Sequence, residues 1–239
     1  MARADLADWR LMRLGLSSAA AADVELADLV QACTQRGLSA LELREEDAHG
    51  VAFADVPAAQ TSLPAGLIAG LYARESTDAV RLARAAVALR APVIVADEGT
   101  AARRVRLARS IAASGGGALP LMRGPARDWL DGVADQDPGY AWEVDPGITD
   151  LARDADLVLR AVRAPDYIRF IGGGPEAALQ EGRGIGVLMG RLALAGYDGA
   201  VVLAPSSPRY RVAWSSWLGR RGGWGCGSKV ADAALVRLY

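Results

Sequence analysis

Charged side chains end most of the apolar runs in this sequence, and their types and spacing could perform chemistry. In "ALELRE" (40–45) Glu42 and Arg44 lie two residues apart, as do Glu143 and Asp145 in "YAWEVD" (140–145). Because successive side chains of a strand point to opposite faces, each of these pairs shares one face. Carboxylates can transfer protons, and guanidinium groups can bind anions. Three other apolar runs contribute Asp97, Arg123 and Arg169 near their ends.

The apolar runs are short enough to be buried strands. Eight segments have this character, and they cover residues 11–18, 40–45, 66–75, 91–98, 118–124, 140–145, 166–172 and 199–205. Segments of helical period lie between several of them, and a strand plus a helix recurs at close to the ~30 residues of a βα unit. Eight such units in 239 residues predict a (β/α)8 TIM barrel. The alternative is an open doubly wound sheet, although its first turn, "GLSSAAAADVE", lacks the GxGxxG pattern.

One of the helical segments illustrates how its ends are predicted. In "STDAVRLARAAVALRAP" (76–92) Ser76 or Thr77 is expected to cap the helix, which stops before Pro92. Val80, Ala83 and Val87 are expected to share a face of this helix.

A barrel places all the charged strand ends at one mouth, and two interpretations of that arrangement remain open. Buried charges are tolerated when they are paired. A ring that contains both carboxylates and guanidinium groups could therefore be buried there and form a polar functional site. The alternative is an ion-pair network that only fills the barrel, or charges that face solvent.

Composition limits the class of protein. The chain is 51% hydrophobic and 23% charged, which is typical of a globular protein. Its net charge of −1 argues against a general nucleic-acid-binding surface. No apolar run reaches the roughly 18 residues of a membrane span, and acidic residues stand where a signal peptide needs an apolar core. We therefore expect a cytoplasmic protein without a membrane or nucleic-acid partner.

The chain is expected to form one domain over residues 1–239, with a Gly/Trp-rich loop and a closing helix at about 213–239. The loop "GRRGGWGCGSK" has the character of a mobile lid or of a loop that contacts nucleic acid. Because the chain is close to neutral, a flexible tail segment or a subunit contact is favoured, and a homodimer is compatible with it. Cys33 and Cys226 are the only cysteines and form no CxxC motif. They are expected to be a buried thiol and a loop thiol, with a disulfide as the alternative.

Three stretches, "QACTQRGLSALELREEDAHG", "APVIVADEG" and "AWEVDPG", resemble the xylose isomerase-like TIM barrels. That superfamily includes sugar-phosphate isomerases and epimerases and the AP endonuclease family 2 proteins. The resemblance covers most of the chain through the order of its elements, and its motifs are moderately specific. It implies a TIM barrel and chemistry on a carbohydrate.

The resemblance also implies a divalent metal, and here the sequence departs from the family pattern. The pattern has a Glu ending strand five, an Asp followed three residues later by His at strand six, a His after strand seven and a Glu ending strand eight. The corresponding residues in this chain are Arg123, Asp145 with Ile148, Arg169, and Ala204 with Pro205. We expect no cofactor and the loss of the usual metal centre, while a Mn, Mg or Zn ion remains the alternative.

Arginine at two vacated positions suggests a replacement for the cation. A guanidinium group can hold an anion bidentately, so Arg123 and Arg169, together with Arg44, are predicted to bind a carboxylate or phosphate. Glu143, Asp145 or Glu42 would then be the group that transfers a proton. The remaining substrate-binding candidates are Asp97, His49, Gly173, Gly174 and Ser206.

The glycines and Ser206 follow the seventh and eighth apolar runs, where barrels often bind phosphate, although a tight turn would also explain the glycines. The sequence thus favours an isomerase or epimerase acting on a small anionic carbohydrate, without a metal. One alternative is a non-catalytic or repurposed binding or scaffold barrel. Another is a metal-free lyase or cyclase of specialised metabolism.

Overall fold

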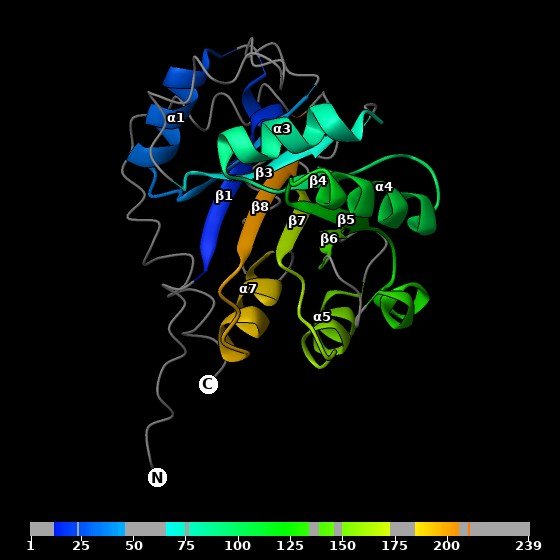
Figure 1. Ribbon diagram of the computed structural model, residues 1–239. Helices are drawn as coiled ribbons and strands as arrows, with labels where there is room; N and C mark the ends of the chain where they lie inside the picture. The colour runs from blue at the N-terminus through cyan, green and yellow to red at the C-terminus, as the bar shows by residue number, and fades with distance from the viewer. Residues whose placement is uncertain are drawn as a thin grey trace.

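A computed structural model describes residues 12–22, 24–45, 66–74, 77–133, 139–145, 150–172, 185–205 and 210. Eight parallel strands close into a barrel in the order β1 to β8 (Figure 1). The strands are β1 (Arg13–Ser17), β2 (Ala40–Arg44), β3 (Ile68–Ala73), β4 (Val93–Val95), β5 (Ala118–Met122), β6 (Ala141–Val144), β7 (Tyr167–Gly172) and β8 (Ala200–Pro205). Closure comes from the pairing of β1 with β8, in which Arg13 lies opposite Ala200.

Each of the eight predicted segments contains one strand, so the barrel prediction is confirmed and the open sheet is wrong. Helices lie outside the strands, with α3 and α4 packed together on one flank and α5 and α7 on another (Figure 1). The α-helices with described bounds are α1 (Leu26–Gln35), α3 (Ala79–Leu89), α4 (Ala101–Ala113), α5 (Leu151–Leu159) and α7 (Ile185–Leu194). Short 3₁₀ helices cover Ser18–Ala21, Ala126–Asp128 and Leu130–Gly132.

The strands are buried on both faces, which explains why they are nearly continuous apolar runs. One large cluster of side chains fills the space between barrel and helices, and includes Leu41, Trp142 and Phe170. A smaller cluster fills the inside of the barrel, and includes Ile94, Leu121 and Val202. Side chains two residues apart along a strand therefore reach the lumen, which is the geometry that the charged strand ends require.

The start of α3 differs from the sequence prediction. Its N-cap is Asp78, whose Oδ1 accepts from the backbone N–H groups of Val80 at 3.1 Å and Arg81 at 3.0 Å. Val80 and Val87 do share a face, but it is the outer one, where they are 52% and 62% exposed. The helix instead buries a face that contains Leu82 and Leu89, because these larger side chains reach the cluster around the barrel.

Helix α1 ends in a turn that contains a glycine. Gly37 follows its last turn with a φ of +69°, a backbone conformation that glycine adopts without strain. Within this helix Cys33 is a buried free thiol, and burial raises the pKa of Cys33 to about 12. Cys226 and the predicted loop and helix at about 213–239 lie outside the described residues. In the part of the chain that is described, no helix is long and apolar enough to cross a bilayer.

Candidate functional site

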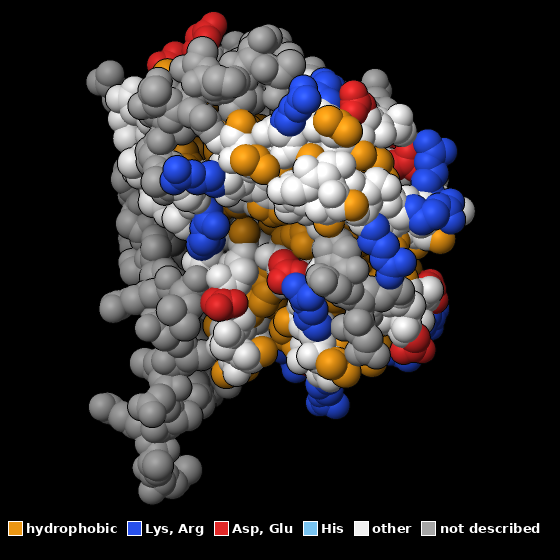
Figure 2. Space-filling view, in the orientation of Figure 1, with side chains coloured by type: hydrophobic (Ala, Val, Ile, Leu, Met, Phe, Trp, Pro, Cys, Tyr) orange, Lys and Arg blue, Asp and Glu red, His pale blue; other side chains and the backbone are white. Residues whose placement is uncertain are grey.

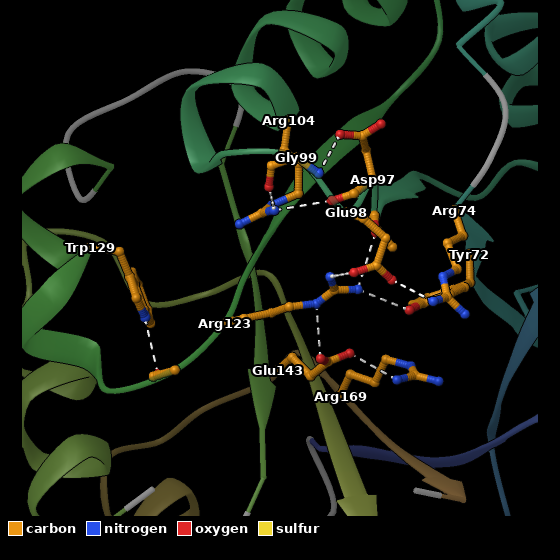
Figure 3. Close-up of polar contacts among 12 residues, drawn as sticks. Tyr72, Arg74, Asp97, Glu98, Gly99, Arg104, Arg123, Trp129, Glu143 and Arg169 are labelled. Carbon is orange, nitrogen blue, oxygen red and sulfur yellow. Dashed lines mark hydrogen bonds and ion pairs between the residues drawn. The ribbon is translucent and has the colours of Figure 1, made fainter. Parts of the chain in front are cut away.

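Three buried charged residues from different strands meet inside the barrel, and Figure 3 shows two of them, Arg169 and Glu143. Arg169 on β7 lies between Glu42 on β2 and Glu143 on β6. Its Nε is 3.2 Å from both carboxylate oxygens of Glu42, and its Nη1 donates to Glu143 Oε2 at 2.8 Å. Arg169 is 5% exposed, Glu42 is 0% exposed and Glu143 is 9% exposed. One guanidinium group therefore neutralises two carboxylates at the centre of the barrel.

Arg123, at the end of β5, connects this buried centre to the outside. Its Nε lies 3.0 Å from Glu143 Oε1 as an ion pair without hydrogen-bond geometry. Its Nη2 donates to the hydroxyl of Tyr72 at 3.2 Å and to the carbonyl of Ala96 at 3.1 Å, and Nη1 lies 3.6 Å from Glu98 Oε2. The side chain of Arg123 is 26% exposed, so this guanidinium can reach a dissolved molecule.

Two tyrosines support the charged residues. The Tyr167 hydroxyl donates to Glu42 Oε2 at 2.8 Å, and the Arg169 guanidinium lies 4.3 Å from the centre of the Tyr72 ring. A cation over an aromatic face is favourable, so the ring of Tyr72 helps to hold Arg169 in the lumen. Gly70 makes room for this layer, because a Cβ there would lie 2.9 Å from Ile94 and 3.1 Å from Tyr167. We call Glu42, Tyr72, Arg123, Glu143, Tyr167 and Arg169 the lumen network.

The electrostatics of the network keep its donors protonated. Burial by itself would lower the pKa of Arg169, but the Glu42 carboxylate and its neighbours raise it above the usual value. Burial raises the pKa of Tyr167 well above its usual value, and the charge of Glu42 raises it further. Tyr167 is therefore a permanent donor to Glu42. Burial also raises the pKa of Tyr72.

The structure brings together some of the predicted site residues and not others. Glu42, Glu143, Arg123 and Arg169 belong to the lumen network, and Arg44 joins it with its guanidinium 5.6 Å from the Tyr72 ring centre. Asp145 is partly buried at the end of β6. His49, Gly173, Gly174 and Ser206 lie outside the described residues.

Asp97 is turned away from the lumen network. Its Oδ1 accepts from the backbone N–H of Gly99 at 2.8 Å, and its Oδ2 lies 3.2 Å from Arg103 Nη2. These contacts join the end of β4 to the start of α4, so Asp97 organises the loop in which it lies.

The two tyrosines and Arg104 were not predicted as site residues. The same period of two that selected Glu42 and Arg44 could have found the tyrosines, since Tyr167 lies two residues before Arg169 and Tyr72 two before Arg74. Arg104 lies on α4, and no pattern within a strand could have found it.

Comparisons with solved structures agree with this architecture. D-psicose 3-epimerase from Clostridium cellulolyticum H10, solved with D-tagatose, has a TM-score of 0.57 and is 15% identical, with 94% of this chain and 97% of that chain covered. A D-tagatose 3-epimerase-like protein has a TM-score of 0.56 and 13% identity over 87% of this chain and 96% of the other. A xylose isomerase domain-containing protein from Salmonella typhimurium LT2 has a TM-score of 0.53 and 14% identity, with 88% of this chain and 98% of that chain covered.

The chain has the fold of the xylose isomerase-like TIM barrels. At this level of identity the similarity concerns the fold, and the sequence matches no protein-family model and no curated protein. The resemblance predicted from the three sequence stretches is confirmed at the level of structure.

The donor set of the described residues does not fit the divalent metal that the resemblance implies. Nowhere in the described ranges do three His, Cys, Asp or Glu side chains gather as a metal site would need. The two carboxylates that converge in the lumen, Glu42 and Glu143, are bridged by the positive charge of Arg169. A cation placed between them would meet that charge instead of free oxygen ligands.

Proposed function

We propose that this barrel isomerises or epimerises a small anionic carbohydrate, and that arginines perform the binding that a metal would otherwise perform. The observation that supports the proposal most is the position of Arg123, which is partly exposed at the mouth and paired with buried Glu143. The similarity of the fold to sugar epimerases supports the reaction class at a coarser level. The substrate and the independence from metal are part of the proposal.

The members of the lumen network would have different roles. Arg123 would bind the anionic group of the substrate, since an exposed guanidinium can form two parallel hydrogen bonds to an oxyanion. Arg169 and Glu42 are buried beneath it and would hold Glu143 in place. Arg44 would add positive charge at the mouth.

The reaction would remove a proton from a carbon next to a carbonyl group and return it to the other face or to the neighbouring carbon. Glu143 or Asp145 would carry that proton, and of the three candidate carboxylates Glu42 is the least accessible because it is 0% exposed. Negative charge that develops on the substrate oxygen would be stabilised by a fixed guanidinium in a partly dry site.

One observation favours a second candidate, a barrel that binds the same class of ligand without chemistry. Both oxygens of Glu143 are held by arginine side chains. These contacts occupy the oxygens that would have to reach the substrate, which suits a structural role.

Solvent hydrogen exchange distinguishes the two candidates. The purified protein is incubated in D2O with pentose and hexose phosphates and with sugar acids, and deuterium in the carbon next to the carbonyl is followed by NMR. The proposal predicts incorporation that falls about 100-fold or more in Glu143→Gln, the usual effect of losing a general base. Binding of a sugar phosphate without any incorporation would support the binding barrel instead.

A further inference from the structure

Arg104, in the first turns of α4, is a buried cation that forms no direct ion pair with any described residue. It is 7% exposed, and its Nη1 donates to the carbonyl of Asp97 at 3.0 Å and of Gly99 at 2.6 Å. Its Nε is buried and without a hydrogen-bond partner in the described part of the chain. A guanidinium group has five N–H donors, so the two bonds leave Arg104 with unused hydrogen-bonding capacity. A charge buried in this state is costly unless something compensates it.

Arg104 lies next to Arg123, the arginine that the proposed function places in contact with substrate. Arg123 donates to the carbonyl of Ala96 and Arg104 to the carbonyl of Asp97, which are consecutive residues (Figure 3). Burial lowers the pKa of Arg104, and the positive charge of Arg123 lowers it further, while the carboxylates of Asp97, Glu143 and Glu98 act in the opposite direction. Two like charges thus approach each other at the end of β4 and β5.

Among the described residues, the surroundings of the two arginines carry an excess of positive charge. The charged side chains counted here are five arginines and three glutamates, which are Arg44, Arg74, Arg104, Arg123 and Arg169, and Glu42, Glu98 and Glu143. The excess stays positive when Asp145 at the end of β6 is counted as well. Arg103 and Asp97 form a pair of their own and add no net charge.

We propose that Arg104 and Arg123 together form the subsite for a phosphate group, so that the substrate of the proposed function is a sugar phosphate. The subsite would take a dianion because it would combine two guanidinium groups, and phosphate offers three oxygens where a carboxylate offers two. This inference rests on the proposed function for the identity of the ligand, while the subsite itself rests on the geometry of the two arginines.

The loop that presents Arg104 is fixed before any ligand arrives. Asp97 holds the N–H of Gly99 and the side chain of Arg103. A Cβ at Gly99 would lie 2.6 Å from Asp97 Oδ1 and 2.8 Å from Arg103 Cδ, so a larger residue would have to displace these two side chains. Thr100 caps α4, and its Oγ1 accepts from the N–H of Arg103 at 3.3 Å. Because the loop is already ordered, binding of an anion there would lose little conformational entropy of the protein.

Calorimetric titration with inorganic phosphate tests the subsite in the full chain. Arg104→Gln is expected to weaken phosphate binding about 10-fold or more, the effect of losing charge-assisted hydrogen bonds. Arg104→Lys is expected to keep part of the affinity. Arg106→Gln is the matched control, because Arg106 is an exposed arginine of the same helix. Figure 2 shows basic side chains on the flank that α4 covers. This control should leave the affinity for phosphate within about 2-fold of the wild-type value. Unchanged phosphate affinity in a folded Arg104→Gln protein would overturn the proposal.

Two further measurements keep the test decisive. Acetate titrated in parallel should bind more weakly than phosphate, and tighter acetate binding would contradict the assignment to a phosphate group. If Arg104→Gln does not fold, a wild-type crystal soaked in phosphate should show the anion within hydrogen-bond distance of both arginines, and an anion elsewhere would overturn the subsite. Phosphate binding lost in Arg104→Gln together with no deuterium incorporation in any sugar would leave the subsite standing while the proposed reaction fails.

Discussion

At the scale of single residues, the lumen network depends on Glu42. This carboxylate accepts from Tyr167 and from Arg169, and the same Arg169 holds Glu143. Glu42 thus sets the position of residues closer to the mouth. The alternation of strand side chains predicted that Glu42, Glu143, Arg123 and Arg169 would come together, because all four lie at inward positions near the carboxyl ends of strands. It could not predict that Asp97 would turn toward α4, since that depends on a loop conformation.

Replacing Glu42 with Gln should be strongly destabilising. The change leaves buried Arg169 with one carboxylate in place of two, and removing one partner of a buried ion pair costs about 3–5 kcal/mol. Denaturant unfolding measures the loss in free energy of unfolding. Glu98→Gln is the control, because the Glu98 side chain is 63% exposed and its pairs should contribute below about 1 kcal/mol. Equal, small losses in the two variants would contradict the role given to Glu42.

At the scale of elements, the strands were easier to predict than the ends of helices. A strand of this barrel is an apolar run buried on both faces, so composition alone marks it. The start of α3 was ambiguous because Ser76, Thr77 and Asp78 are consecutive and all are good caps. Tertiary packing decides among them, since it fixes which face of the helix meets the barrel. The structure has Asp78 as the N-cap and buries Leu82 and Leu89, while Val80 and Val87 stay exposed.

The N-cap of α3 gives a prediction at this scale. Asp78→Ala removes the acceptor for two backbone N–H groups and should lower the free energy of unfolding by about 1 kcal/mol. Thr77→Ala changes the neighbouring residue, which does not cap the helix, and should have less than about 0.5 kcal/mol of effect. The midpoint of thermal unfolding, followed by circular dichroism, compares the two. A larger loss in Thr77→Ala would show that the cap had been misassigned.

At the scale of the whole molecule, the barrel gathers charges from strands far apart in sequence at one mouth. The described residues place arginine where the resemblance expected metal ligands, and those arginines neutralise the carboxylates that a cation would need. The fold and the mixed charge of the site were predictable from eight apolar runs and their charged ends. The part played by Arg104 was not, because it depends on how α4 packs beside β4.

The central claim is that arginines bind the substrate where related barrels would use a metal ion. It is tested most directly by measuring the Kd of a sugar phosphate by calorimetry, before and after the protein is treated with EDTA and dialysed. The account predicts that Kd stays within about 2-fold after chelation, whereas Arg123→Gln weakens binding about 10-fold or more. Binding that disappears on chelation and returns when Mn²⁺ is added would contradict it.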